Sequence, residues 1–411
     1  MNAGGPLAGV RIVEASMLGP AALTTHLVDL GAEVIKVESP RGDYIREMTW
    51  PIVEGVSLMH LHINRGKHSI VLDLRTAGGR EVFLDLVRKS DGVVEAMRPG
   101  GLERRGISYA DMCEVNPRIV FATISGYGAT GPYRDLASHG IAYDAWAGLI
   151  PPEELPDGHY AIPEHASMGI HAGPLYGALG LVAGILRARA TGQGSRFEIA
   201  QSDAAAAMDW LRSETWRAYE RPETEVTGNK ADGYERRAPG TAGMRAGVRY
   251  QFYQSADGFV LFMASEREFW QNFCVGLGRQ ELFDRFPGPK YADHARGNLE
   301  LREELRQIFL TRTTAEWIEF ANHHNTAIAP VNTPQSLADD PQFRVRMPWQ
   351  SAERLGADML PSPLKFLDET LPVPARAPVL EQHSEAVLRD VLGYDTDTIA
   401  RLRAESALGE K

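Results

Sequence analysis

Two histidines of this chain have the side chain that most often moves protons in enzymes. His139 follows Ser138, and His171 lies two residues after Gly169 and shortly before a stretch of small residues. The pKa of a free imidazole lies near neutrality, so each histidine could act as a general base. A structural interpretation stays open for both, as a hydrogen-bonding residue in the core, at an interface or beside the start of a helix.

Other patterns that could indicate a nucleophile or a metal are weak. Ser167 has a glycine two residues after it but none two residues before it, which does not support a nucleophile elbow. The pairs His60/His62 and His323/His324 lack the i,i+4 spacing and the further ligands of a zinc site. The sequence therefore predicts no metal site.

Several basic residues lie in or beside the loops that follow the expected strands. They are Lys36, Arg41, Lys67, Arg98, Arg104 and Arg105. Each alone is compatible with a solvated surface role. As a cluster they indicate an anionic ligand, because ligands of parallel sheets bind beyond the carboxyl ends of the strands.

The N-terminal half alternates strand and helix patterns. Apolar strands are expected at 10–14, 33–37, 92–95, 119–124 and 195–200, and helices at 20–31, 79–89, 109–116, 173–186 and 203–219. This alternation predicts an α/β fold with a mostly parallel sheet covered by helices. No G-x-G-x-x-G follows the first strand, so the usual dinucleotide fingerprint is absent.

Composition limits the partners. The formal net charge of -11 argues against nucleic acid and against an anionic membrane, since both require a broad basic surface. The apolar run 173–186 is shorter than the ~20 residues that span a bilayer, and the first residues lack a basic region before an apolar core. We expect no membrane association and a cytoplasmic protein, whose Cys113 and Cys274 are core thiols.

Six sequence blocks, in order, resemble those of the class III CoA-transferases, the family of formyl-CoA transferase, carnitine CoA-transferase and α-methylacyl-CoA racemase. They lie at 9–14, 30–38, 64–74, 98–106, 125–132 and 191–194. The resemblance implies a Rossmann-like large domain, a smaller α+β domain and two interlocked subunits. The expected parts are 1–219 (large domain, first part), 220–247 (linker and glycine loop), 248–335 (small domain) and 336–411 (a return segment completing the large domain).

The resemblance also implies coenzyme A, as substrate and thioester, in place of a bound cofactor. The residues that correspond to family CoA contacts, or lie in the matching loops, are Ser16, Lys36, Arg41, Lys67, Leu72, Ala96, Met97, Arg98, Arg104 and Arg105. By resemblance, Arg104 and the pair Ala96-Met97 lie where the family contacts adenine and phosphate. The sulfur-bearing side chain of Met97 would suit contact with the ring.

In this family an aspartate carboxylate attacks the acyl-CoA thioester. The corresponding position here is Gly169 or Ile170, depending on the glycine used for alignment, and no placement gives Asp or Glu. Glu164, five residues upstream of Gly169, is a poor substitute. His139 resembles the base of the racemases, but a two-base racemase would lack its second acid, and Gly140 replaces a typical Asp.

We therefore expect a CoA-transferase subunit without its own nucleophile. Its partner would be a homologous Asp-bearing subunit, in a heterodimer or heterotetramer, and its substrates an acyl-CoA such as succinyl-CoA and a carboxylic acid. Heteromeric family members of anaerobic aromatic degradation have such an arrangement. The alternatives are a stand-alone acyl-CoA racemase, lyase or hydrolase that uses His139 or His171, and a structural paralogue without catalysis.

Overall fold

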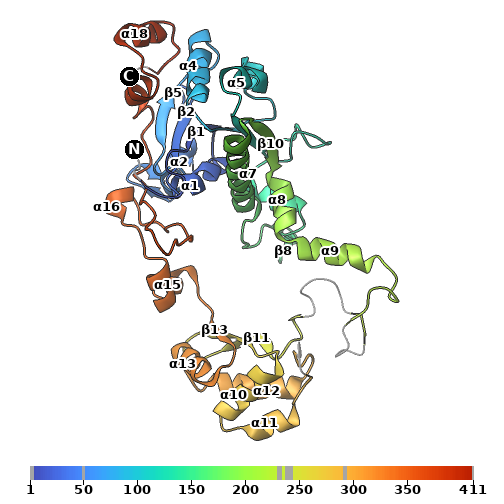
Figure 1. Ribbon diagram of the computed structural model, residues 1–411. Helices are drawn as coiled ribbons and strands as arrows, with labels where there is room; N and C mark the ends of the chain where they lie inside the picture. The colour runs from blue at the N-terminus through green and yellow to red at the C-terminus, as the bar shows by residue number, and fades with distance from the viewer. Residues whose placement is uncertain (1–3, 49–50, 229–233, 237–243, 290–293, 410–411) are drawn as a thin grey trace. The chain divides into compact units, whose positions relative to one another are not determined.

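The computed structural model of the chain describes residues 4–48, 51–228, 234–236, 244–289 and 294–409. Its centre is a six-stranded sheet in the order β10-β7-β6-β1-β2-β5, with every neighbouring pair parallel (Figure 1). The strands are β1 (Arg11–Ser16), β2 (Glu33–Glu38), β5 (His68–Val71), β6 (Gly92–Ala96), β7 (Val120–Ser125) and β10 (Ser195–Ala200). The predicted α/β fold with a parallel sheet is confirmed.

Helices cover both faces of this sheet, as parallel sheets require. On one face, α1 (Ala22–Val28) and α7 (Gly169–Thr191) bury an apolar cluster that includes Leu23 and Leu181. On the other, α4 (Ala77–Arg88), α5 (Tyr109–Val115) and the C-terminal α18 (Thr396–Ala404) enclose a second cluster around Phe83. Because both faces are covered, the carboxyl ends of the strands are left as the edge where a ligand can bind.

Helix α7 is longer than the apolar run expected at 173–186. It has 23 residues, and an 18-residue window within it has a mean hydropathy of 1.4, so it is long and apolar enough to cross a membrane by length and composition alone. Core helices meet the same criterion, and Ala178, Leu181, Ile185 and Ala188 of α7 are buried against the sheet. The fold uses this helix as a central support of the sheet.

The C-terminal segment returns to the edge strand β5. Asp73 N donates to Ala407 O at 2.9 Å, His383 N donates to Ser69 O at 3.0 Å, and Leu72 forms a bridge with Leu408. Two short elements lie in this segment, the helical turn α17 (Ser384–Ala386) and the π-helical η5 (Val387–Val391). The segment thereby closes the sheet at the strand that borders the pocket described below.

Residues 210–346 form a separate compact unit, while 1–209 and 347–411 form the unit that contains the parallel sheet. The smaller unit has the antiparallel sheet β11 (Tyr250–Gln254), β12 (Phe259–Met263) and β13 (Ile328–Pro330). Its apolar core, which includes Trp270, Phe309 and Trp317, is shared with α10 (Arg267–Gly276), α11 (Gln280–Arg285), α12 (Leu299–Phe309) and α13 (Thr314–His324).

The domain boundaries expected at 219, 247 and 335 stay predictions. The single helix expected at 203–219 is two helices, α8 (Gln201–Met208) and α9 (Trp210–Tyr219). Half of the expected glycine loop at 240–247, with Gly240 and Gly243, lies outside the described residues.

The remaining elements are short. They are η1 (Gly19–Ala21), α2 (Ile45–Met48), β3 (Ile52–Val53), β4 (Val56–Ser57), α3 (Leu58–Ile63), η2 (Glu103–Arg105), α6 (Gly140–Trp146), β8 (Glu153–Glu154), β9 (Tyr160–Ala161), α14 (Pro334–Leu337), α15 (Pro341–Arg346) and α16 (Ala352–Leu355).

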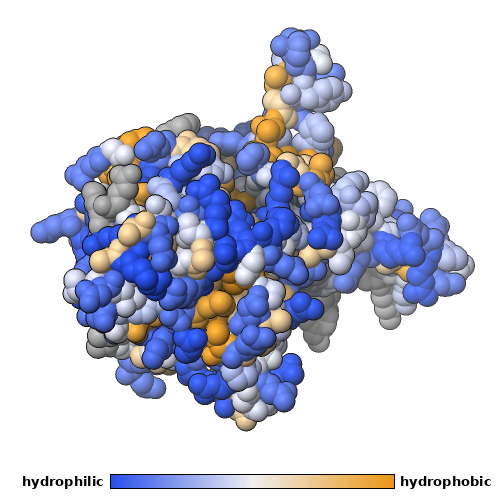
Figure 2. Space-filling view, turned by 90° about the horizontal axis from the view of Figure 1, so that it is seen from above, coloured by the Kyte–Doolittle hydropathy of each residue, from blue (hydrophilic) through white to orange (hydrophobic). Residues whose placement is uncertain are grey.

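The face of the molecule seen in Figure 2 is largely hydrophilic, in line with a net charge of -11.

Candidate active site

A pocket of about 400 Å³ lies at the carboxyl ends of β1, β2 and β5. It brings together five of the residues predicted to contact coenzyme A, which are Ser16, Arg41, Leu72, Met97 and Arg105. Ser16 is the last residue of β1, and Leu72 directly follows β5. Residues far apart in the sequence meet here because the carboxyl ends of parallel strands share one edge.

Two arginines at this edge are available for an anion. The side chains of Arg41, in the loop after β2, and Arg98, after β6, are exposed and make no hydrogen bond or ion pair with any described residue. Arg41 lines the pocket directly. A free guanidinium presents several N–H donors, and such donors form strong charge-assisted hydrogen bonds with phosphate.

The other two predicted arginines hold a loop in shape. Arg104 donates to Pro99 O at 2.7 Å and to Arg98 O at 3.2 Å, and Arg105 donates to Gly101 O at 2.8 Å. These bonds fold the segment after Ala96, the last residue of β6, so that Met97 and Arg105 reach the pocket. Part of their role is therefore to position the loop.

Lys36 and Lys67 lie elsewhere than the sequence suggested. Neither side chain has exposed surface, and neither lines the pocket. Lys36 Nζ lies 3.1 Å from Glu14 Oε1 and 3.1 Å from Asp43 Oδ2, while Lys67 Nζ lies 2.8 Å from Glu14 Oε2. Lys36 also donates to Ser16 O, and Lys67 to Ala21 O. Because both ammonium groups are fully paired inside the protein, these two residues stabilise the structure beneath the pocket and do not bind a ligand there.

Glu14, which sequence reasoning did not single out, is the centre of this network. Burial would raise its pKa, but the charges of Lys67 and Lys36 outweigh that effect and lower it to about 2. Burial lowers the pKa of Lys67 to about 8, although Glu14 opposes the shift. A charged residue inside an otherwise apolar strand was the one available hint, because such residues are rarely buried unless paired.

The first turn of α7 lies beside α6. Gly169 has no room for a side chain, because an added Cβ would lie 2.8 Å from Tyr143 Cβ and 3.2 Å from Gln201 O. Its N–H donates to Asp144 Oδ1 at 2.8 Å, and the N–H of Met168 donates to the same oxygen at 3.1 Å. Asp144, which sequence reasoning missed, therefore caps α7; its side chain is fully buried, so it cannot meet a substrate without rearrangement.

Ile170 is the residue of this turn whose side chain has a clear direction. A Cβ at Gly140 would lie 2.6 Å from Ile170 Cγ2, and a Cβ at Gly19 would lie 3.9 Å from Ile170 Cβ. The side chain thus points to the start of α6 and toward η1. Of the two positions that the sequence analysis aligned with the family aspartate, position 170 holds a side chain here, whereas position 169 has no room for one.

The two candidate histidines flank this position. His139 directly precedes α6, with no capping hydrogen bond from its side chain, and its side chain is exposed. His171 is exposed in the first turn of α7. Among the described residues no cluster of three or more His, Cys, Asp or Glu side chains could hold a metal ion.

Comparison with known proteins gives a consistent result. A profile of CoA-transferase family III matches residues 7–384. The chain is 27% identical to the succinyl-CoA–L-malate CoA-transferase beta subunit of Chloroflexus aurantiacus over 416 residues, which cover 98% of each chain. It is 29% identical to human succinyl-CoA:glutarate CoA-transferase, covering 98% of this chain and 90% of the relative.

The fold has solved counterparts. A CaiB/BaiF family protein from Brucella suis superimposes with a TM-score of 0.75 at 25% identity, covering 94% of this chain and 99% of that one. The acetyl-CoA:oxalate CoA-transferase of Acetobacter aceti is 28% identical over 347 residues, or 83% of this chain and 85% of the relative. With the family profile spanning nearly all of the sheet unit and the whole smaller unit, the chain belongs to CoA-transferase family III.

Proposed function

We propose that this chain is a subunit of a heteromeric CoA-transferase that moves coenzyme A between carboxylic acids, and that it lacks the nucleophilic aspartate itself. The observation that carries the proposal is the first turn of α7, where Gly169 leaves no space for a side chain and Ile170 supplies an apolar one. In this proposal Ile170, rather than Gly169, stands in the place of the family aspartate.

The chemistry explains why a second subunit is needed. The nucleophile must form a bond to the thioester carbonyl while the bond to the thiolate breaks, giving a mixed anhydride and free CoA thiolate. The thiolate then attacks the carbonyl of the enzyme's carboxyl group, which gives an enzyme–CoA thioester and releases the first acid as a carboxylate. The second acid attacks this thioester and frees the thiolate, and the thiolate attacks the acyl carbonyl of the new mixed anhydride, which gives the second acyl-CoA and restores the enzyme carboxylate. A carboxylate suits both directions, because the leaving acid and thiolate are comparable leaving groups. Neither glycine nor isoleucine offers an oxygen nucleophile.

The pocket at the carboxyl edge of the sheet supports coenzyme A as the ligand. Arg41, Met97 and Arg105 line this pocket, and the exposed Arg98 offers a further guanidinium group in the loop after β6 at the same edge of the sheet. In the proposal these residues, with Ser16, Leu72, Ala96 and Arg104, hold the CoA moiety. Two relatives named as succinyl-CoA transferases, and one named as a succinate–glutarate CoA-transferase, support succinyl-CoA or a similar thioester as the donor.

An apolar surface on α7 supports a partner chain. Leu175, Leu179 and Leu186 are 50%, 66% and 65% exposed, although they belong to a central helix of the sheet unit. One relative is a beta subunit by name, so unlike subunits occur among similar proteins. We propose that the homologous Asp-bearing subunit covers this surface in an interlocked dimer or tetramer, in the cytoplasm.

A second candidate uses His139. Its side chain is exposed directly before Gly140, whose missing side chain leaves room for Ile170. A stand-alone enzyme could exchange the α-proton of an acyl-CoA through this imidazole. Deuterium uptake at the α-carbon that is abolished by His139→Ala would favour this candidate, whereas a lack of uptake across a panel of acyl-CoAs would remove it.

The test of the heteromer is to purify the untagged protein from its native host and to identify co-purifying chains by mass spectrometry. We expect a homologue with Asp at the position of Ile170, and CoA transfer by the pair but not by either chain alone. Robust CoA transfer by the pure chain would contradict the proposal.

A further inference from the structure

The loop that carries Arg41 is folded around one buried carboxylate, that of Glu38. Glu38 is the last residue of β2, is 4% exposed and lines the proposed CoA pocket. Its Oε1 accepts from Asp43 N at 3.1 Å. The carboxylate thereby joins the start of the loop at 39–43 to its end, and Arg41 lies between these two points.

Arg46, in α2, fixes the orientation of this carboxylate. It donates to both oxygens of Glu38, and its Nη2 lies 3.0 Å from Oε2. Burial would raise the pKa of Glu38, but hydrogen bonds from Arg46 and the charge of Lys36 outweigh burial and lower this pKa. Glu38 is therefore charged at neutral pH, and hydrogen bonds to a charged acceptor are stronger than those to a neutral one.

Ser69 connects the same carboxylate to β5 and to the C-terminal segment. Its hydroxyl donates to Glu38 Oε2 at 2.6 Å, while Glu381 N donates to the hydroxyl oxygen at 3.0 Å. A hydroxyl has one hydrogen and can accept as well as donate, so the two bonds are compatible and fix its direction. The loop after β2 is thus tied to a neighbouring strand and to a segment from the other end of the chain.

The end of the loop is held independently. Asp43 is 2% exposed, and its Oδ2 lies 3.1 Å from Lys36 Nζ. Gly42 has a φ of +71°, a conformation that glycine adopts without strain, and a Cβ at this position would lie 3.2 Å from the side chain of Leu380. Because the turn is fixed at both ends and covered by Leu380, the backbone of Arg41 has its position before a ligand binds.

The guanidinium group of Arg41 has no such support of its own. The side chain is exposed, lines the pocket and makes no hydrogen bond or ion pair with any described residue. Its place in the pocket is therefore decided by the loop backbone. Charge-assisted hydrogen bonds to phosphate depend on the distance and angle of the donor, so a displaced loop would weaken them.

We propose that Glu38 is a positioning residue of the CoA site, which holds the loop at 39–43 so that Arg41 meets a phosphate group of coenzyme A. Glu38 itself does not bind the phosphate, because both of its oxygens already accept hydrogen bonds and its charge repels an anion. The inference rests on the proposed function, since it takes coenzyme A as the ligand of this pocket.

The test is a double-mutant cycle on the binding of coenzyme A, measured by isothermal titration of the purified 411-residue chain. The four proteins are the wild type, Glu38→Gln, Arg41→Ala and the double variant. Gln has the size of Glu, but its single oxygen cannot accept from all the donors that Glu38 binds. We expect Glu38→Gln to weaken binding by about threefold to tenfold. In the Arg41→Ala background the same change should alter the affinity by less than about twofold.

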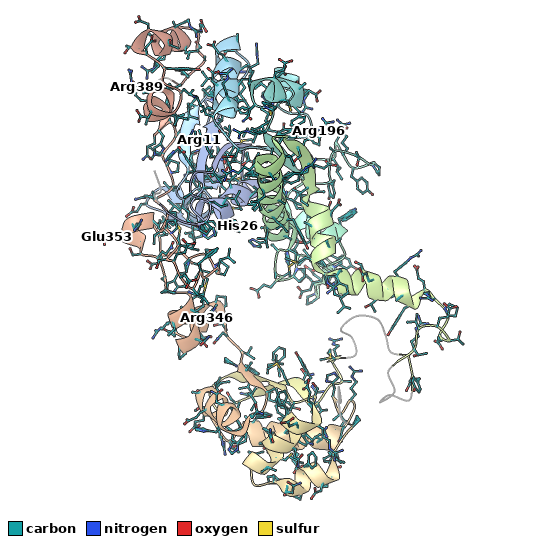
Figure 3. All side chains as sticks on the ribbon, in the orientation of Figure 1. Arg11, His26, Arg196, Arg346, Glu353 and Arg389 are labelled. Carbon is teal, nitrogen blue, oxygen red and sulfur yellow. The ribbon has the colours of Figure 1, made fainter. Side chains whose placement is uncertain are left out.

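Glu33→Gln is the matched control. Glu33 is the first residue of the same strand and pairs with Arg11, which is labelled in Figure 3. This variant should bind coenzyme A as the wild type does. Ser69→Ala is a milder second variant, because it removes one donor and keeps the carboxylate and its pair with Arg46. It should weaken binding by about threefold, again only when Arg41 is present.

Circular dichroism and urea unfolding show which variants are folded under the conditions of the titration. A merely structural role would lower the free energy of unfolding without changing the affinity of the folded protein. The inference is overturned if the folded variants bind coenzyme A as tightly as the wild type, or if they lose affinity equally with and without Arg41. A wild-type chain that binds no coenzyme A would instead contradict the proposed CoA pocket itself, and this inference with it.

Discussion

The side chain of Ile170 fills the space that Gly140 leaves open where α6 and α7 meet. The Cβ that Gly140 lacks would lie 2.6 Å from Ile170 Cγ2, closer than side-chain carbons approach each other. A bulky side chain at 170 therefore requires glycine at 140. Positions 140 and 170, at which the resemblance predicts departures from family aspartates, therefore pack as one unit.

This coupling predicts a non-additive pair of substitutions. Gly140→Ala should destabilise the chain by about 1–3 kcal/mol through overpacking. In the Ile170→Ala background the same change should cost much less, since the colliding Cγ2 is gone. Urea unfolding of the four proteins measures the coupling. Gly258→Ala, where an added Cβ would make only an ordinary contact of 3.4 Å, is the control, and equal costs in both backgrounds would disprove the match.

The free guanidinium at the pocket predicts the strength of CoA binding. Arg41→Ala should weaken the binding of coenzyme A by about tenfold, the value of a charge-assisted hydrogen bond to phosphate. Arg389→Ala removes an exposed arginine that pairs with Glu385, far in sequence from the pocket, and should leave the affinity unchanged. Titration calorimetry measures both affinities. If Arg41→Ala binds coenzyme A as tightly as the wild type does, Arg41 does not contact a phosphate of coenzyme A.

The buried network beneath the pocket predicts a large loss of stability. Glu14→Gln leaves Lys36 and Lys67 without their shared carboxylate and should cost about 3–5 kcal/mol. Glu33→Gln, which breaks a partly exposed pair with Arg11, should cost about 1 kcal/mol or less. Denaturant unfolding at neutral pH compares them, and similar small losses would show that the lysines find other partners.

The lowered pKa of Glu14 also predicts that the free energy of unfolding falls in acid. In the unfolded chain this carboxyl has its ordinary pKa of 4.5, and in the folded chain about 2. Its contribution to stability is present above pH 4.5 and is lost as the pH falls toward 2. The wild type should lose more stability across this window than Glu14→Gln does.

Burial of His60 predicts a second acid response at higher pH. Burial, assisted by the charge of Arg46, lowers the pKa of His60 from 6.5 to about 4. Its Nε2 lies 3.2 Å from Pro378 O, so the neutral ring links α3 to the returning C-terminal segment. The unfolded chain takes up the proton first, so stability is lost as the pH falls from 6.5 to about 4. A His60→Gln variant should show a flatter profile of unfolding free energy in that window, and an unchanged slope would contradict the account.

The fold was predictable because strand and helix patterns alternate strongly along the first half of the chain. The strand at 92–95 and the helix at 109–116, for example, are present within a residue at each end. Helix 203–219 was wrong as a single element, since Asp209 interrupts it. Position along the sequence indicated which loops meet at the sheet edge, and Arg41, Met97 and Arg105 do meet there.

Which charged side chains are buried could not be predicted from the sequence. The residue type alone does not tell whether a basic side chain reaches solvent or a buried carboxylate: Lys36 and Lys67 pair with buried Glu14, whereas Arg41 lines the pocket. Asp144 was missed for a similar reason, because its partners are backbone N–H groups of a helix that begins 25 residues later in the sequence. The lack of room for a side chain at position 169, and the space that the side chain of Ile170 occupies, depend on packing against Tyr143 and Gly140, which only the folded chain reveals.

Intact-mass spectrometry of the pure chain after incubation with succinyl-CoA tests the central claim most directly. We predict that the wild-type chain gains no covalent adduct, whereas Ile170→Asp, which places a carboxylate beside Gly140, becomes modified by CoA or the acyl group. A covalent adduct on any carboxylate of the wild-type chain, prepared free of other subunits, would contradict the proposal that its nucleophile comes from a partner.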